Sequence, residues 1–444
     1  MTQVRRQRSI DIVAKITERC NLACTYCYFF FGGDETWLRH SAVMKPATIE
    51  ALAGFLARGA RELELDDIYL GLHGGEPLLM KKPAFDAMCS RLKAAMPERT
   101  RLYLGVQTNG MLIDAEWIDL FEKHEVGIGI SLDGPAAVND RARIDKKGRG
   151  SHARVLQGLR IAQEAARAGR IAQPGCLCVI DPDQDPAEVY DHLIGELGFA
   201  SVSFLLPREG HDTGMRIDAG KWRGFMRRLV AHWTDPATPT VPMRILSEPL
   251  KGMISDEGAA WRDMRIANRH NVITVTSDGE LGPDDNLKGQ DPRFQETGMS
   301  VFDTTLGEFI ESPLWQGIVT GIDQLPQRCR GCDWRRVCGG GDVFNRYSRA
   351  HGFSRESVFC DALDEMHLEL ARYAAGHGIL ADEIAERLSR PPSFRASNLA
   401  EARHDARDVS NERRMGLNRT DAPVAGHVAE EESALLLRPA GSPT

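Results

Sequence analysis

The chain alternates short apolar runs with longer amphipathic stretches from about residue 10 to residue 237. Short runs rich in β-branched residues and bounded by Gly, Asp or Asn are typical of buried strands. Apolar residues three and four positions apart, as in 46–60 and 152–169, indicate helices. The predicted strands are residues 9–17, 67–73, 101–108, 126–132, 175–180 and 201–207.

This alternation of strands and helices predicts an α/β fold with a parallel sheet and helical crossovers. Periodicity alone does not distinguish an open sheet from a closed or partial barrel. In each of these architectures the chemistry gathers at the carboxyl ends of the strands. Polar or glycine-rich clusters follow the predicted strands, so we expect the functional site there.

Two changes of composition divide the chain further. From about residue 238 the sequence has short strands, glycines and four clustered cysteines, and beyond about 385 it is rich in charge, Pro, Ser and Ala. A length of 444 residues suits one large core with a smaller domain. We expect an N-terminal extension (1–9), a core domain (10–237), an auxiliary domain (238–375), and a helix end with a disordered tail (376–444).

Composition excludes several classes of protein. No apolar run approaches the roughly 20 residues of a membrane span, and the N-terminus lacks the apolar segment of a secretory signal. A net charge of -8 argues against nucleic acid as a partner. We expect a cytoplasmic protein that binds neither membrane nor nucleic acid. Its ten cysteines are then ligands, catalytic groups or buried thiols rather than disulfides.

The first cysteine cluster follows the first predicted strand. Cys20, Cys24 and Cys27 form a C-x3-C-x2-C motif, and the nearest downstream histidines are His40 and His73. Structural zinc almost always takes four ligands, whereas three thiolates suit a 4Fe-4S cluster with one open iron. The cluster is favoured, with zinc or buried free thiols as the alternatives.

The second cysteine cluster lies in the auxiliary region. Cys329, Cys332 and Cys338 form C-x2-C-x5-C, and Cys360 follows. Four thiolates saturate four iron corners, so one auxiliary 4Fe-4S cluster is the direct interpretation. A four-cysteine zinc site is the alternative.

The first motif, with Tyr26 immediately before Cys27, resembles the signature of the radical S-adenosylmethionine (SAM) superfamily. The resemblance implies a partial (β/α)6 TIM-like barrel that binds SAM through the open iron. An electron from a flavodoxin- or ferredoxin-type donor, passed through the cluster, would cleave SAM to a 5′-deoxyadenosyl radical. That radical would abstract hydrogen from an unactivated C–H bond.

Later motifs in the barrel region strengthen the resemblance. They are "LHGGEP" (72–77), "QTNG" (107–110), "SLDGP" (131–135) and "NDRARIDKKGRGS" (139–151), although Asn-Gly and Asp-Gly also mark ordinary turns. Glycines allow close backbone approach, and a carboxylate accepts from an ammonium. By resemblance to radical SAM peptide and protein maturases, the SAM contacts are Tyr26, Gly74, Gly75, Glu76, Ser131 and Arg143.

The auxiliary region resembles a SPASM domain with a reduced cysteine set, which implies one auxiliary cluster instead of two. "SDGELGPDDNLK" and "CGGGDVFNRYS" resemble maturases that form three-residue cyclophanes in ribosomally made peptides. Such enzymes join an aromatic ring carbon to a side-chain β carbon two positions away. The implied partner is a ribosomal precursor peptide. No leader-recognition domain is expected before residue 10, so its leader would bind the barrel, the auxiliary domain or a partner.

Crosslinking to an aromatic ring also requires a base. Asp285 aligns with the acidic base of related sulfatase maturases, and burial is expected to raise its pKa into a useful range. The alternative is that Asp284 and Asp285 are turn residues after Pro283. Arg346 and Tyr347 either meet a peptide or cap the auxiliary loop. Cys89, Cys176 and Cys178 are expected to be buried thiols.

Two alternatives to cyclophane formation remain. The nearer one is another radical SAM modification, namely formylglycine formation on a sulfatase, thioether formation or epimerisation. The remote one is a non-catalytic metal-binding regulator or electron carrier.

Overall fold

The computed structural model describes residues 8–391, except 215–216 and 270. All six predicted strands form, and each observed boundary lies within two residues of the expected one. The strands pair in parallel from each one to the next. They are β1 (Ser9–Thr17), β2 (Asp67–Gly74), β3 (Arg101–Thr108), β4 (Val126–Ser131), β5 (Gly175–Val179) and β6 (Val202–Leu205).

The sheet continues beyond the predicted core domain. Strand β7 (Val272–Val275) pairs in parallel with β1, and β8 (Leu281–Gly282) pairs antiparallel with β7. The sheet therefore has eight strands in the order β6-β5-β4-β3-β2-β1-β7-β8. Because β1 lies between β2 and β7, the auxiliary region is joined to the barrel through the sheet itself.

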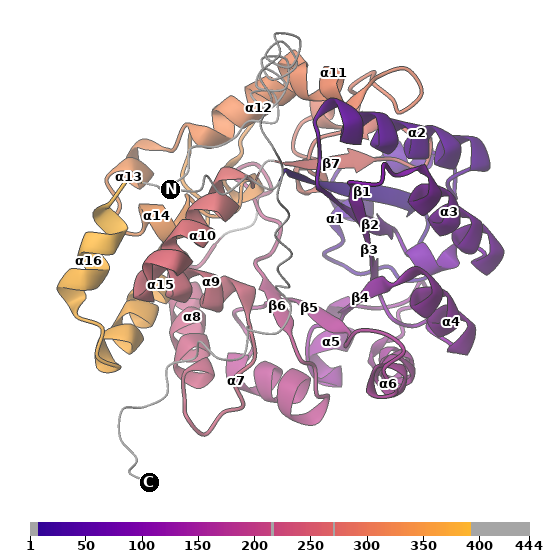
Figure 1. Ribbon diagram of the computed structural model, residues 1–444. Coiled ribbons are helices and arrows are strands. Elements are labelled where there is room, and N and C mark those ends of the chain that lie inside the picture. Colours follow the sequence, from indigo (N-terminus) through magenta and orange to yellow (C-terminus); the bar gives the residue numbers. More distant parts are fainter. Residues whose placement is uncertain (1–7, 215–216, 270, 392–444) are drawn as a thin grey trace.

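Helices cover the outer face of the strand arc, as Figure 1 shows. Buried faces of α2 and α3 pack on the strands through Leu52, Phe55 and Phe85, each of which has no exposed surface. The expected partial barrel is thus confirmed. Its outer helices are α2 (Pro46–Glu62), α3 (Lys82–Ala95), α4 (Ala115–His124), α6 (His152–Arg167) and α7 (Pro186–Tyr190), which continues into a π-helical turn (Asp191–Glu196). The short helix α5 (Ala136–Ala142) follows β4 and lines the central cavity.

A row of glycines lines the inside of the arc. Gly71, Gly105 and Gly127 stand next to one another in the register of β2, β3 and β4. A Cβ atom added at any of them would meet only a backbone oxygen, at 3.7–3.9 Å. Glycine weakens a strand, so this row leaves interior space at a cost in strand stability.

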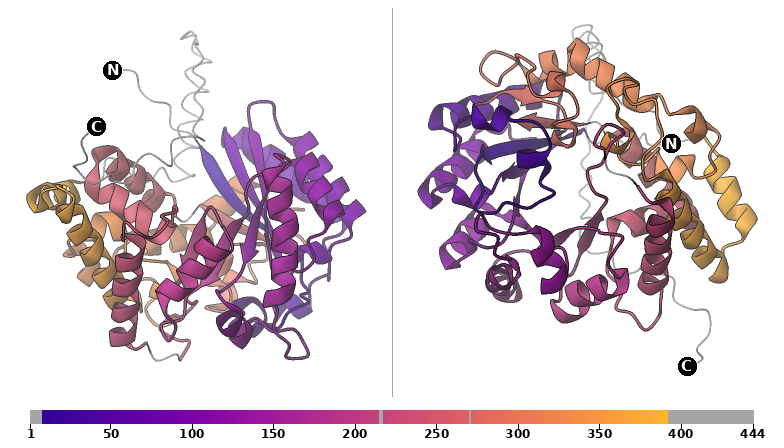
Figure 2. Two further views of the ribbon diagram at one scale, coloured as in Figure 1. Left: turned by 90° about the horizontal axis from the view of Figure 1, so that it is seen from below. Right: turned by 180° about the vertical axis from the view of Figure 1, so that it is seen from behind.

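The C-terminal helices complete the ring opposite the strands (Figures 1 and 2). Helix α8 packs against α15, where the rings of Trp222 and Phe359 lie 4.8 Å apart. These helices are α8 (Ala219–Trp233), α9 (Arg244–Ile254), α10 (Asp256–Ala267), α11 (Leu306–Glu311), α12 (Pro313–Asp323), α13 (Gln327–Arg330), α14 (Arg335–Cys338), α15 (Cys360–Gly376) and α16 (Ala381–Ser389).

Helix α16 corrects the predicted start of the tail. Composition placed the tail beyond about residue 385, but the helix continues to Ser389. Ile384 and Leu388, four positions apart, are both buried, and Arg387 donates to Asp256 at 3.0 Å. Composition alone did not reveal this helix, because only two of its residues are buried. Residues 1–7 of the extension and 392–444 of the tail lie outside the described residues.

Across the described ranges, the helices are all too short or too polar to cross a bilayer.

Glu18 connects the end of β1 to the turn after β7. Its backbone N–H donates to Ala42 O at 3.0 Å, and one carboxylate oxygen accepts from Ser277 N at 3.3 Å. The other oxygen, Oε2, is buried and finds no hydrogen-bond partner within the described part of the chain. Burial raises the pKa of Glu18 from 4.5 to about 7.

We predict that Glu18→Gln stabilises the protein at alkaline pH. The raised pKa means that the folded state holds the proton more tightly than the unfolded state. The wild-type free energy of unfolding therefore falls as pH rises from about 4.5 to about 7. Glutamine does not ionise, so the variant should gain up to about 3 kcal/mol above pH 7 and little at pH 4.5. Anaerobic denaturant titrations at both pH values measure this, and an equal difference at both would contradict it.

Candidate active site

A cavity of about 1990 Å³ opens at the carboxyl ends of the strands. It exceeds the roughly 300–1000 Å³ of most small-molecule sites, so it has room for a cofactor and part of a larger substrate. The auxiliary region contributes Cys338 and Asp342 to its wall. The predicted site residues that line it are Cys20, Cys24, Tyr26, Cys27, Gly74, Gly75, Glu76, Ser131, Arg143, Asp285 and Cys338.

The first cysteine cluster forms the loop between β1 and α1 (Tyr28–Phe31). Cys20, Cys24 and Cys27 are all half-buried and interact electrostatically with one another. Cys27 N donates to Cys24 O at 3.0 Å, which curls the loop. The two nearest histidines are engaged elsewhere, because His40 Nδ1 lies 3.5 Å from Asp278 and His73 Nδ1 lies 3.1 Å from Lys15 Nζ. The loop thus presents three thiols without a fourth Cys or His.

The donor set fits an iron-sulfur cluster better than a single ion. In the described residues, no three Cys, His, Asp or Glu side chains lie close enough together to hold one metal ion. Burial raises the pKa of Cys20 to about 12 and also raises that of Cys24. A bound metal offsets this cost because it deprotonates a coordinating thiol. Three convergent thiols suit a cluster with one open iron.

The glycines of "LHGGEP" bring two loops together. A Cβ added to Gly74, whose φ is +148°, would lie 2.1 Å from Thr17 O, and one added to Gly75 would lie 2.3 Å from Arg19 O. Gly75 N donates to Thr17 O at 3.0 Å. We expected these glycines to approach a ligand; in the structure they allow β2 to touch the start of the cysteine loop.

Glu76 is buried and its carboxylate is engaged by the protein. It accepts from Leu78 N at 3.0 Å, from Thr108 Oγ1 at 2.6 Å and from Asn109 N at 2.8 Å. These bonds tie the ends of β2 and β3 together. Contact of Glu76 with a ligand ammonium stays a prediction, whereas its bracing of the two strand ends is observed.

Tyr26 and Arg143 meet at the cavity wall. The Tyr26 hydroxyl accepts from Arg143 Nη1 at 2.7 Å and donates to Asp133 Oδ2 at 2.5 Å. Arg143 Nε is buried and has no hydrogen-bond partner in the portion of the chain described. Ser131 lies beside them and accepts from Gln107 at 2.8 Å. Sequence reasoning missed Asp133, although it quoted "SLDGP", because a turn explained that aspartate.

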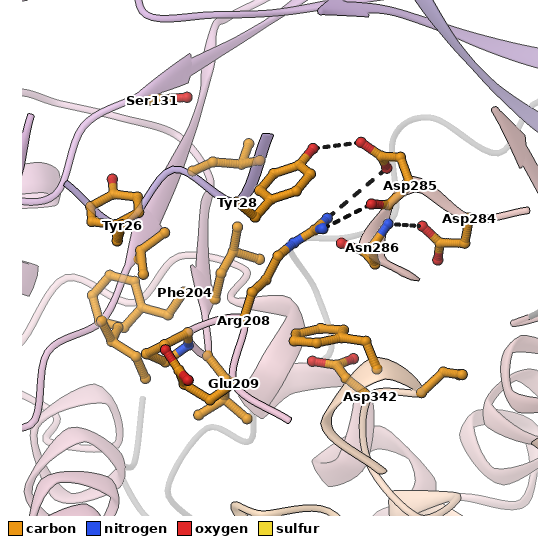
Figure 3. A pocket seen from close by; sticks show the side chains of 18 of the residues that line it. Tyr26, Tyr28, Ser131, Phe204, Arg208, Glu209, Asp284, Asp285, Asn286 and Asp342 are labelled. Carbon is orange, nitrogen blue, oxygen red and sulfur yellow. Dashed lines mark hydrogen bonds and ion pairs between the residues drawn. The ribbon is translucent and has the colours of Figure 1, made fainter. Parts of the chain in front are cut away.

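A second polar group, absent from the sequence predictions apart from Asp285, occupies the opposite wall (Figure 3). Lys15 on β1 forms a buried ion pair with Asp285, and Tyr28 donates to Asp285 at 2.5 Å. Arg208, just beyond β6, donates to Asp285 O at 3.0 Å and stacks over the Tyr28 ring at 3.3 Å. No local signal set Lys15 apart, because it shares one face of the first strand with Ser9 and Asp11 in an ordinary alternation of polar and apolar residues.

The pKa expected for Asp285 was wrong in direction. Burial raises the pKa of this carboxyl, but Lys15 and Arg208 together lower it well below its usual range. Burial and the Lys15 ammonium lower the pKa of His73 to about 3. Burial and the Asp285 charge raise the pKa of neighbouring Asp284 to about 6. Of the two carboxyls, Asp284 therefore has the pKa nearer to neutral pH.

The auxiliary cysteines also converge. Cys329 lies in α13, Cys338 ends α14 and Cys360 begins α15, while Cys332 lies in the loop between α13 and α14. Cys338 interacts electrostatically with Cys329 and Cys332, and Cys360 interacts with Cys338 and Cys329. Three short segments thus bring the four thiols within electrostatic range of one another, and a four-thiolate cluster takes such a set of ligands.

Several smaller predictions are settled by burial. Arg346 has no exposed surface and Tyr347 donates to Asp291 at 2.7 Å, so this pair caps the auxiliary loop instead of facing a peptide. Cys89, Cys176 and Cys178 are buried thiols, as expected.

Comparison with known proteins agrees with this geometry. Residues 14–173 match the model of the Radical SAM superfamily. The chain is 26% identical over 341 residues to the serine-type anaerobic sulfatase-maturating enzyme of Klebsiella aerogenes, covering 74% of this chain and 78% of that protein. It is 20% identical over 367 residues to the cysteine-type enzyme of Clostridium novyi (strain NT), covering 80% and 93%.

Solved structures share the fold. Native anSMEcpe with bound AdoMet and Kp18Cys peptide superposes with a TM-score of 0.66 at 19% identity, over 83% of this chain and 99% of that one. Streptococcus suis SuiB bound to the precursor peptide SuiA gives 0.55 at 16% identity, over 80% and 76%. The expectation of an enzyme is confirmed over that of a non-catalytic regulator. Residues 14–173 form a radical SAM domain, and the chain that carries it is a radical SAM enzyme.

Proposed function

We propose that this enzyme matures a ribosomal precursor peptide by joining an aromatic ring carbon to a side-chain β carbon, which forms a three-residue cyclophane. The chain modifies peptides or proteins, in keeping with the sulfatase-maturating relatives and with the fold shared with peptide-bound SuiB. The reaction removes two hydrogens from the peptide. One leaves the β carbon as an atom, and the other leaves the ring as a proton and an electron.

The observation that carries this proposal is the acidic pair Asp284–Asp285 on the cavity wall. Both carboxylates line the cavity, where Asp285 accepts from the Tyr28 hydroxyl beside the cysteine loop and Asp284 accepts from Asn286 N at 2.9 Å (Figure 3). When bound, the three-cysteine cluster and SAM supply the radical that abstracts the β hydrogen. Asp284, whose pKa is about 6, is ionised at neutral pH and accepts the ring proton.

In this proposal Asp285 positions the side chains around it and does not accept the proton. Lys15 and Arg208 keep it ionised, and its carboxylate holds the Tyr28 hydroxyl immediately after Cys27. This assignment moves the role of base from Asp285, where resemblance placed it, to its neighbour.

We assign the electron to one auxiliary 4Fe-4S cluster held by Cys329, Cys332, Cys338 and Cys360. Thiolates suit such a cluster, and the four cysteines lie next to the cavity wall at Cys338. A flavodoxin- or ferredoxin-type protein is the proposed donor for the SAM cluster. All ten cysteines are unpaired, which suits the reducing cytoplasm.

We also propose the domain division 10–237 and 238–375, with β7 and β8 as strands that the second domain adds to the sheet of the first. The SAM-contacting set stays as proposed: Tyr26, Gly74, Gly75, Glu76, Ser131 and Arg143.

The first test is the mass of a small peptide encoded beside this gene and co-expressed anaerobically with the enzyme. We expect the peptide to lose the mass of two hydrogens with wild type and none with Cys24→Ala. Fragmentation should fail between an aromatic residue and a residue two positions away. A free aldehyde at Ser or Cys would instead indicate formylglycine chemistry, and unchanged mass with active SAM cleavage would contradict the crosslink.

A second test separates the two carboxylates. Asp284→Asn should lower crosslink formation roughly a hundredfold, the typical contribution of a general base. In wild type, crosslink formation should rise as pH increases through about 6, because the raised pKa leaves Asp284 protonated below that value. The residual activity of Asp284→Asn should lack this rise. Product and 5′-deoxyadenosine are measured together from about pH 5 to pH 8, and an unchanged pH profile in the variant would reject Asp284 as base.

A third test concerns Arg143, whose buried Nε suits a carboxylate ligand. Arg143→Lys keeps the charge but loses the planar fork, so SAM binding should weaken roughly 10- to 100-fold. Equilibrium dialysis with iron-loaded protein measures the affinity. Iron content should equal that of wild type, and Arg141→Lys, on the exposed side of the same helix end, serves as the matched control. Unaltered affinity in Arg143→Lys would exclude the contact.

A further inference from the structure

Two guanidinium groups near the auxiliary cysteines, those of Arg346 and Arg269, have no carboxylate within ion-pair distance among the described residues. Arg346 has no exposed surface and donates only to the carbonyls of Ile322 (3.1 Å), Gln324 (3.3 Å) and Phe353 (2.8 Å). Half-buried Arg269 donates to the carbonyls of Gly339 and Ile322. The Nε atoms of both are buried without a hydrogen-bond partner among the described residues.

Both guanidiniums lie directly against the backbone of the three glycines that follow Cys338. A Cβ added to Gly340 would lie 3.4 Å from Arg346 Nη1, and one added to Gly339 would lie 3.0 Å from Arg269 Nη1. Arg346 interacts electrostatically with Cys329 and Cys338, and Arg269 interacts with Cys338. The two cations therefore lie beside the same cysteine group.

The glycine run has an unusual backbone. Gly339, Gly340 and Gly341 all have left-handed φ values, of +63°, +90° and +75°. The backbone N–H of Gly340 acts on the Cys338 thiol and lowers its pKa against the effect of burial. Consecutive N–H groups in such conformations form concave anion sites, including sites around iron-sulfur clusters. Backbone N–H groups and guanidiniums thus lie around the sulfur of Cys338.

This arrangement is costly without an anion. A buried cation loses several kcal/mol of hydration, and carbonyl dipoles replace only part of it. The carboxylate that acts on both arginines is Asp323, which is exposed and lies beyond ion-pair distance of either within the described chain. By contrast, Arg262, also near Cys338, pairs with Glu248 at 2.6 Å. Besides Asp323, the acidic groups that act most strongly on the two arginines are thus the thiols of Cys329 and Cys338, which become thiolates when they bind a metal.

We propose that Arg346, Arg269 and the Gly339–Gly341 loop form a cationic cradle that raises the reduction potential of the auxiliary cluster. The inference rests on the proposed auxiliary cluster and states which residues set the reduction potential of that cluster. One-electron reduction adds a negative charge without forming or breaking a bond to the protein. Nearby positive charge and hydrogen bonds to sulfur favour that reduced form. The cradle thereby suits the cluster to accept the electron released by the peptide.

The test measures the auxiliary potential in full-length protein that carries Cys20→Ala, Cys24→Ala and Cys27→Ala, so that one cluster remains. Anaerobic redox titration followed by electron paramagnetic resonance reports the reduced fraction. Adding Arg269→Gln should lower the ratio of reduced to oxidised cluster about tenfold at the parent midpoint, a shift of about 59 mV to more negative potential. Arg346→Lys retains the charge and should shift it much less than Arg346→Gln.

The matched control is Arg328→Gln. Arg328 also interacts with a cluster cysteine, Cys360, but it is exposed and pairs with Asp361 at 3.1 Å. Its removal should leave the potential nearly unchanged. Iron retained with an unshifted potential in Arg269→Gln would overturn the cradle alone. Loss of all iron from the parent triple variant would overturn both the auxiliary cluster and the cradle, so the two failures are distinguishable.

Discussion

The arrangement of the site depends on one lysine buried inside the barrel, because its charge requires a counter-charge. Lys15 projects from the central strand β1 with 1% of its surface exposed, and an ammonium in that position requires an anion. Asp285, 270 residues later in the chain, supplies it. Removal of one partner from a buried pair typically costs about 3–5 kcal/mol. This ion pair therefore holds the loop after β8 against the barrel interior.

The same ion pair organises the cavity wall. Tyr28 follows the last cysteine of the first cluster, and its hydroxyl reaches the carboxylate that Lys15 holds. Arg208, at the end of β6, closes the group from the other side (Figure 3). The cysteine loop, the end of the barrel and the auxiliary region thus share one carboxylate. Movement of any one of these three parts would alter the contacts that the other two make with Asp285.

Charge also explains why adjacent aspartates differ. Two cations lower the pKa of Asp285, which therefore stays ionised. Burial and the negative charge of Asp285 raise the pKa of Asp284. Two carboxylates in sequence thereby receive pKa shifts of opposite sign, which is how one site separates a positioning group from a proton acceptor. Near the auxiliary cysteines the balance is reversed, since two arginines, Arg269 and Arg346, act on the thiols without a carboxylate at ion-pair distance in the described part of the chain. In both regions the charged side chains are already in place in the protein without a ligand.

The local sequence determined a large part of this protein. Alternating patterns located the six barrel strands, and the spacing of Cys20, Cys24 and Cys27 identified the radical SAM domain. These features are local, because strand periodicity and loop spacing are written in neighbouring residues.

Tertiary structure alone decided the rest. It paired β7 with β1, placed Lys15 opposite Asp285 and reversed the expected pKa of Asp285. It also surrounded the Arg346 guanidinium with backbone carbonyls. The physical reason is that a pKa, or the need for a counter-charge, depends on groups within a few ångströms in space. Folding brings those groups together from positions that can lie hundreds of residues apart in the chain.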